Sequence, residues 1–297
     1  MNTQHIIEIP KNKNSNNTSK KYKIINCQDN VNNDKDTSKW IKLENIIKET
    51  DIIKIFKSYL LNKQKVIIKI GIKDSIIREY NASKILLSIL GFINYLCYFK
   101  CNNDLKKINI NTSIYSNNDK TDELQIILMK EYISDIKSYK WNKDNFNILK
   151  SLFKQIFLSL YIAYKQYGFI HNDSHYGNFL LKKQKKEYII YNYNNEEIKI
   201  NSEGYSVVIM DFKSSLFEKD RNSYNILCSD FISIINNIDS ILKISTKNND
   251  LINKYLLKKI DFDIKYLLEL VDKLEYIEHK NIISNYEELL KNCYNNI

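Results

Sequence analysis

The chain has 297 residues, of which 43% are hydrophobic and 27% charged, so it can bury a core and is not disordered throughout. Its formal net charge of +10 is typical of a lysine-rich solvated surface and is also compatible with an anionic partner such as a nucleotide or an acidic peptide. No dense Lys/Arg block with interleaved aromatic residues occurs, which argues against specific nucleic-acid binding.

Composition also bears on location. The five cysteines are scattered and form no CxxC pair, which indicates reduced thiols in an intracellular protein, cytoplasmic or nuclear, rather than a zinc site. The N-terminus has no apolar signal core, and the most apolar stretch (152–164) is interrupted by Lys154 and Gln155, so no membrane span is expected. Asn, Ile, Lys and Tyr are abundant, a bias that suggests an AT-rich genome, as in some protists and large DNA viruses. No pattern predicts an oligomeric state.

The first part of the chain reads as a tail followed by strands and a helix. Residues 1–38 are rich in Asn, Lys, Ser and Asp, which predicts a flexible tail that could carry a short strand. Periodicity in 40–62 does not separate two strands from one amphipathic helix. The β-rich run KVIIKI (65–70) predicts a strand, and apolar residues at helical spacing in 74–90 predict a helix.

Two further strands and the clearest helix follow. NYLCYFKC (94–101) and LQIILMKEY (124–132) are predicted as strands joined by the polar stretch 102–123. NFNILKSLFKQIFLSLYIAYKQYG (145–168) predicts a long core helix, with Gly168 at the position of a C-terminal cap.

The rest of the chain predicts a hairpin, a buried strand and then helices. KKEYIIYNYNNEEIKI (185–200) is typical of a hairpin, and SVVIMDF (206–212) of a buried strand. From about Cys228 onward the pattern favours helices with turn-like breaks. This order predicts an α+β protein with a β-rich lobe and a mainly helical lobe.

Polar side chains of catalytic type are concentrated in the segment GFIHNDSHYGNFLL (168–181), which contains two of the four histidines in the chain. Asp173, Asn178 and Asp211 form the pattern D-x-x-x-x-N followed by D-F. Phosphoryl transfer from ATP needs such a set: one carboxylate receives the proton of the acceptor hydroxyl, while an Asn oxygen and a second carboxylate hold Mg²⁺ against the phosphates. We therefore expect Asp173 as the catalytic residue and Asn178 and Asp211 as metal ligands.

These motifs resemble the protein kinase-like superfamily and, within it, haspin and related kinases of large DNA viruses. IHNDSHYGN stands where family members carry their catalytic loop, and MDFK stands where they carry D-F-G. The resemblance implies a bilobal fold, with an N-lobe at 39–132 and a C-lobe at 133–297. It also implies ATP and Mg²⁺ as cofactors and a protein substrate.

The same resemblance assigns roles to residues outside the central motif. Lys69 of VIIK corresponds to the phosphate-binding lysine, and Glu79 corresponds to the helix glutamate that pairs with it. LMKEY corresponds to the last N-lobe strand and hinge, with its nucleotide-binding positions at Met129 and Glu131. The residues expected to support the catalytic loop are His171, His175 and Asp230.

Several positions depart from the family pattern. The loop KETDII (48–53) has no glycine, and its Glu49 and Asp51 would lie near an anionic ligand and weaken ATP binding. Asn172 replaces the arginine that often precedes the catalytic aspartate, and Lys213 replaces the glycine of D-F-G. No A-P-E motif exists.

The sequence accordingly supports one main functional hypothesis and two alternatives. The main hypothesis is a Mg²⁺- and ATP-dependent protein Ser/Thr kinase with a degenerate glycine-rich loop. The degenerate loop and Lys213 favour a pseudokinase that acts as a scaffold or binding module. The D-x-H-x-x-N form and the short segment after Asp211 favour a small-molecule phosphotransferase similar to aminoglycoside or choline kinases.

Overall fold

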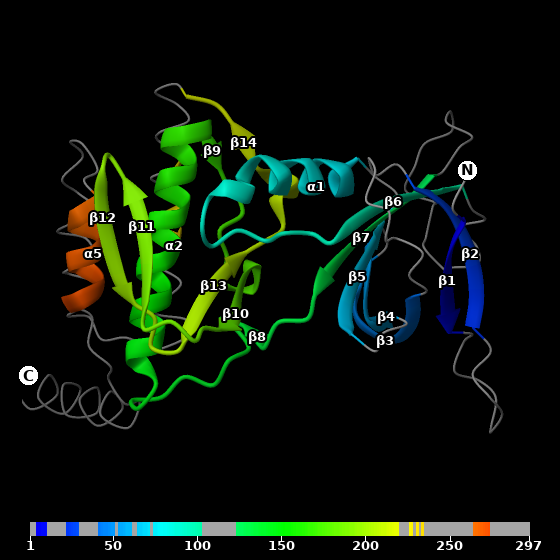
Figure 1. Cartoon of the computed structure of the whole chain (residues 1–297), viewed down its shortest axis with the longest axis horizontal. Helices are drawn as coiled ribbons and strands as arrows, with labels where there is room; N and C mark the ends of the chain where they lie inside the picture. Colours follow the sequence, from blue (N-terminus) through cyan, green and yellow to red (C-terminus); the bar gives the residue numbers. More distant parts are fainter. Residues whose placement is uncertain are drawn as a thin grey trace, which may run out of the picture. The chain divides into compact units, whose positions relative to one another are not determined.

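The structure is a computed structural model and combines helices and strands in two compact units (Figure 1). The first unit contains Met1–Leu87 and Ile93–Glu131, and the second contains Ser88–Phe92 and Tyr132–Ile297. Most of the stretch after Cys228 that was expected to be helical lies outside the described part of the chain. The structure describes residues 4–10, 22–29, 41–50, 53–60, 64–71, 74–102, 123–219, 226–227, 230–231, 233–234 and 264–273.

The first unit contains a run of five hydrogen-bonded antiparallel strands. Its order is β3–β4–β5–β7–β6. The described residues of the segment 40–62 (41–50 and 53–60) thus form two strands and not a helix, because β4 pairs along almost its whole length with β5 and buries Phe56 opposite Ile68. The strands are β3 (Ile41–Glu49), β4 (Ile53–Leu60), β5 (Lys65–Gly71), β6 (Cys97–Asn102) and β7 (Glu123–Lys130).

Two more strands lie in the segment for which a flexible tail was expected. β1 (Gln4–Pro10) and β2 (Tyr22–Asp29) pair antiparallel with each other along their full length. β2 also pairs with β6, and β1 pairs in parallel with β3, so that the strands close into a barrel. Residues 1–38 therefore contain more regular structure than the single short strand that their composition suggested.

Helix α1 (Ser75–Ile85) packs against β7 in the first unit. Its first turn is capped from the sheet, because the backbone N–H of Ile77 donates to Oε1 of the buried Gln125 of β7 (3.1 Å). The Tyr80 ring of the helix stacks on the Tyr98 ring of β6, with 5.3 Å between the ring centroids. Since helix N–H groups in the first turn have no partner within the helix, this bond fixes where α1 starts on the sheet.

The second unit is built around one long helix and several short strands. Helix α2 (Phe146–Tyr167) carries buried residues along almost its whole length. The mainly helical second half that the sequence predicted is not shown by the described residues, which contain the helices α2 and α5 (Ile264–Lys273) beside seven short strands. These strands are β8 (Ser134–Asp135), β9 (Phe169–Ile170), β10 (Phe179–Lys183), β11 (Tyr188–Tyr193), β12 (Glu196–Asn201), β13 (Tyr205–Ile209) and β14 (Leu216–Phe217).

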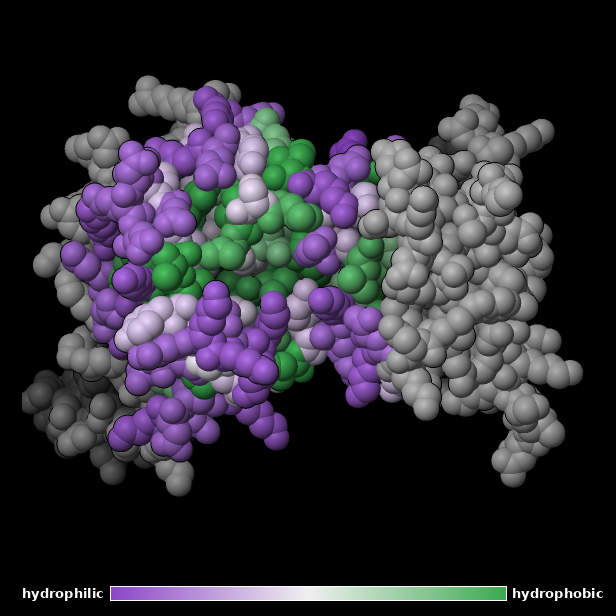
Figure 2. Space-filling model, viewed as in Figure 1, coloured by the Kyte–Doolittle hydropathy of each residue, from purple (hydrophilic) through white to green (hydrophobic). Residues whose placement is uncertain are grey.

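The predicted hairpin of β11 and β12 covers one side of α2. Its inner residues Ile189, Tyr191 and Ile200 are buried, while alternate residues are exposed. Figure 2 shows hydrophilic side chains with some hydrophobic ones between them on this side of the unit, and the exposed side chains of the hairpin include Tyr188 and Ile190. No helix in the described residues is long and apolar enough to cross a membrane, α2 included.

A buried glutamine explains the polar interruption in the apolar run of α2. Gln155 accepts a hydrogen bond from the backbone N–H of Val207 in β13 (2.9 Å), and its amide nitrogen donates to the Ser151 hydroxyl (3.0 Å). A buried amide with partners on both ends avoids the cost of an unsatisfied polar group. Gln155 therefore fixes β13, the strand that leads to Asp211, against the long helix.

Gly168 ends α2 in the left-handed conformation, as the sequence predicted (φ 68°). A Cβ built at this position would lie 2.7 Å from the backbone oxygen of Glu218, which is too close for any real contact. Gly168→Ala should therefore lower the free energy of unfolding by more than the roughly 1–2 kcal/mol of left-handed strain alone. Urea denaturation of the variant measures this loss.

Gly204→Ala is the matched control. Gly204 also has a positive φ of 76°, but a Cβ there would meet no atom within 4 Å. This variant should show only the left-handed strain of about 1–2 kcal/mol. Equal losses in the two variants would contradict a steric role for the contact between Gly168 and the backbone of Glu218.

Candidate active site

The segment after β9 is held in place by buried polar groups. His171 lies fully buried, with its Nε2 2.9 Å from the backbone oxygen of Met210. Asn172 takes a left-handed backbone conformation (φ 57°), and its N–H donates to Oδ2 of Asp230 (2.8 Å). Burial raises the pKa of Asp230, and the hydrogen bond from Asn172 opposes this shift. His171 and Asp230 thus connect the loop to two other parts of the second unit.

Asp173 and Asn178 lie at opposite ends of the short loop that follows. The Nδ2 of Asn178 donates to the backbone oxygen of Asp173 (2.9 Å), and the Asn178 N–H donates to the backbone oxygen of His175 (2.9 Å). These bonds close the loop over five residues. They use the amide nitrogen of Asn178 and leave its Oδ1 as the acceptor atom of that side chain.

The register of β10 and β13 places Asp211 beside this loop. Phe179 pairs with Ile209, and the N–H of Met210 donates to the backbone oxygen of Asn178 (3.0 Å). Asp211 follows directly in a left-handed conformation (φ 66°). The structure therefore brings together the three residues that the sequence selected for acid–base and metal chemistry, Asp173, Asn178 and Asp211.

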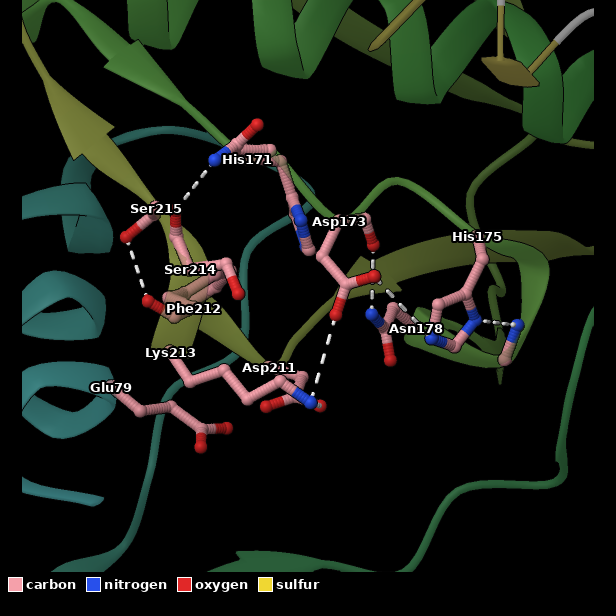
Figure 3. A network of polar contacts seen from close by, with 12 residues as sticks. Glu79, His171, Asp173, His175, Asn178, Asp211, Phe212, Lys213, Ser214 and Ser215 are labelled. Atoms are coloured by element: carbon pink, nitrogen blue, oxygen red, sulfur yellow. Dashed lines mark hydrogen bonds and ion pairs between the residues drawn. The ribbon is translucent and has the colours of Figure 1, made fainter. Parts of the chain in front are cut away.

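Lys213 lies between two of these residues (Figure 3). Its Nζ is 3.4 Å from Oδ2 of Asp211 and 3.6 Å from Oδ2 of Asp173. The sequence marked Lys213 only as a departure from the family pattern and did not predict these ion pairs. The sequence signal that could have indicated these ion pairs is the position of the lysine, two residues after the candidate site residue Asp211.

His175 approaches Asp173 from the other side (Figure 3). The N–H of Gly177 donates to Nδ1 of His175 (3.1 Å), so a neutral ring carries its proton on Nε2. That Nε2 lies 3.9 Å from Oδ1 of Asp173. The histidine is thus positioned by the loop, with its proton-bearing nitrogen toward the carboxylate.

In the first unit, Lys69 of β5 and Glu79 of α1 form a buried ion pair. The Lys69 Nζ is 2.5 Å from Oε2 of Glu79, and the two side chains are only 6% and 2% exposed. The hydroxyl of the buried Tyr95 donates to the other oxygen of Glu79. Tyr95 is a contact that sequence reasoning missed, because it depends on where the chain runs after α1.

The two residues expected at the hinge have different surroundings. Met129 is buried and pairs with Ile67, so it lies on the sheet face that also carries Lys69. Glu131 is bound by two lysines, with 3.1 Å between its Oε1 and the Lys57 Nζ and 3.9 Å between its Oε2 and the Lys65 Nζ.

The loop KETDII, which lacks glycine, forms the turn between β3 and β4. Thr50 closes it, because its N–H donates to the oxygen of Ile53 (2.9 Å) and its hydroxyl accepts from the Ile53 N–H (3.0 Å). Glu49 forms an ion pair with the buried Lys54 across this turn, a pairing that the sequence did not predict. The negative charge expected from Glu49 is therefore compensated, while Asp51 lies outside the described residues.

Comparison with known proteins gives partial similarity to protein kinases. No protein-family model matches the chain. It is 34% identical over 116 residues to the serine/threonine-protein kinase haspin of Mus musculus, covering 37% of this chain and 15% of the mouse protein. It is 33% identical over 100 residues to the haspin of Bos taurus, covering 33% of this chain and 13% of the bovine protein. The chain thus matches only a small part of these relatives, and this similarity points to the protein kinase-like superfamily.

Proposed function

We propose that this chain is an ATP- and Mg²⁺-dependent phosphotransferase with a bilobal kinase-like fold and a protein Ser/Thr hydroxyl as acceptor. The observation that carries the proposal is the convergence of Asp173, Asn178 and Asp211 through the β10–β13 register. The buried pair of Lys69 and Glu79 supports it independently. The partial similarity to haspin favours a protein acceptor over a small molecule.

The residues present fit a magnesium ion. Asp211 offers carboxylate oxygens and Asn178 an amide oxygen, and hard cations prefer such ligands. No group of three His, Cys, Asp or Glu side chains in the described segments could hold a metal alone. Phosphate oxygens would complete the ligand set, as is usual for Mg²⁺ with nucleotides. When bound, the metal neutralises phosphate charge during the transfer.

The protein groups then have separate tasks. Asp173 accepts the proton of the acceptor hydroxyl as that oxygen bonds to the γ-phosphorus, while the bond from this phosphorus to the β–γ bridging oxygen breaks and ADP leaves. Lys69 offsets phosphate charge, and Glu79 holds the Lys69 ammonium in place. Most of the rate enhancement comes from positioning and charge compensation.

A pseudokinase is the second candidate, and two observations favour it. Lys213 forms ion pairs with the candidate catalytic residue Asp173 and with the candidate metal ligand Asp211. A tight turn in place of a glycine-rich loop points the same way. In that case the same fold would serve as a binding module without phosphoryl transfer.

Thermal unfolding with nucleotide distinguishes the two candidates. A ligand present at 100 times its dissociation constant stabilises the native state by about 2.7 kcal/mol. We expect ATP with Mg²⁺ to raise the Tm more than ATP alone, and Asp211→Asn to remove the Mg²⁺-dependent part of that rise. The exposed Asp144 provides the control, because Asp144→Asn should leave the rise unchanged. A Tm insensitive to ATP and Mg²⁺ would contradict the enzyme and favour the scaffold.

A further inference from the structure

Lys213 has a fixed backbone and a tethered charge. It lies in the single helical turn Phe212–Ser214, whose fully buried Phe212 ring contacts the Phe169 ring at 5.6 Å between centroids. The Nδ2 of Asn172 donates to the backbone oxygen of Ser214 (3.3 Å). The start of the Lys213 side chain is therefore held, while the side chain itself is 40% exposed and can rotate toward solvent.

The lysine compensates charge at a place where two carboxylates converge. Asp173 and Asp211 are 30% and 16% exposed, and each presents its Oδ2 to the same ammonium. Two like charges brought this close repel each other unless a cation lies between them. His175 is the other titratable group described against Asp173, and its 3.9 Å distance is longer than either lysine distance.

The distances show how firmly the ammonium is held. At 3.4 and 3.6 Å, both are longer than a direct charge-assisted hydrogen bond of about 2.7–2.9 Å. A compact ammonium midway between two oxygens interacts with both charges without being locked to either. Such an ion can be replaced by another cation that binds the same oxygens.

We propose that Lys213 is a tethered counter-ion that holds Asp173 and Asp211 in the metal-free protein and that a divalent cation must displace it from Asp211. The inference rests on the proposed function only in taking Asp211 as a metal ligand. Lys213, which stands where the family pattern has a glycine, thus lowers the affinity of the site for metal. Asp211 then binds metal well only when nucleotide phosphates add further ligands.

Binding of Mn²⁺, followed by electron paramagnetic resonance without nucleotide, tests the inference directly. Lys213→Met keeps the length of the side chain and removes its charge, and we expect it to bind Mn²⁺ roughly three- to tenfold more tightly than the wild type. Lys213→Arg keeps the charge and should stay close to the wild type. Because salt screens exposed charges, the difference between wild type and Lys213→Met should shrink at high ionic strength.

Two controls separate the local effect from net charge and from other sites. Lys182→Met removes one exposed lysine of β10 elsewhere on the same unit and should leave the Mn²⁺ affinity unchanged. Adding Asp211→Asn to Lys213→Met should abolish the gain. Far-ultraviolet circular dichroism confirms that each variant is folded.

Equal or weaker Mn²⁺ binding by Lys213→Met would overturn the inference. If that variant instead lost affinity for ATP without metal, Lys213 would be a phosphate ligand, which also overturns it. The proposed function fails on a different measurement, namely no Mg²⁺-dependent ATP binding in any variant. Tighter Mn²⁺ binding by Lys213→Met in that case would sustain the counter-ion and reject the phosphotransferase.

Discussion

Asp173→Asn is expected to lower phosphoryl transfer by about 10²–10⁴-fold, the range that a positioned general base contributes. The amide keeps the shape of the carboxylate but cannot accept the proton of the acceptor hydroxyl. Asp173 is 30% exposed and its nearest cation, Lys213, is 40% exposed, so the loss of this ion pair should cost less than about 1 kcal/mol of stability. Transfer of the labelled γ-phosphoryl group from radiolabelled ATP to a serine-containing acceptor measures the rate of phosphoryl transfer.

Two companion measurements make this result specific. Asp144→Asn removes a carboxylate from an exposed turn before α2 and should leave transfer unchanged. The Mg²⁺-dependent rise in Tm with ATP should persist in Asp173→Asn, because Asn178 and Asp211 remain. Transfer at the wild-type rate in Asp173→Asn would remove this residue from the mechanism.

Separating Lys69 from Glu79 is expected to produce the largest loss of stability. Removing one partner of a buried ion pair takes away the charge that compensates the other and costs about 3–5 kcal/mol. Both side chains are almost fully buried, so solvent cannot take over that compensation. Lys69→Met and Glu79→Gln should each show this loss in urea denaturation.

The double variant Lys69→Met/Glu79→Gln should be far less destabilised than the sum of the single variants. It removes both charges of this pair, and the amide oxygen can still accept from the Tyr95 hydroxyl. Nucleotide affinity should follow the same non-additive pattern, because each single change removes the same positioned ammonium. Additive losses in this double-mutant cycle would contradict the coupling of β5 and α1.

An exposed ion pair in the second unit provides the matched cycle. Lys154 of α2 and Asp272 of α5 form an ion pair in which the aspartate is 62% exposed. Double-mutant coupling there should stay within about 1 kcal/mol, since solvent screens the charges. The contrast between the two cycles measures how much burial contributes to the Lys69–Glu79 interaction.

Local patterns were enough to predict several features of this chain. The 3.6-residue periodicity and the single glycine at 168 predicted α2 and its end, because helix formation and left-handed caps depend on neighbouring residues. The spacing of Asp173 and Asn178 predicted a loop that brings both residues to one place, and a hydrogen bond joins the two residues. The β-rich runs at 65–70 and 124–132 predicted strands that the structure contains.

Other features depend on contacts between distant segments. Periodicity could not choose between helix and strands in 40–62, and pairing of β4 with β5 decided for strands. Asp211 reaches Asn178 only because β10 and β13 pair in one register, and Lys213 reaches both carboxylates as a consequence. The partners Tyr95 and Lys54 likewise come from outside any local pattern. Short-range patterns determine which element forms, whereas strand register and side-chain contacts are set by packing between residues far apart in the chain.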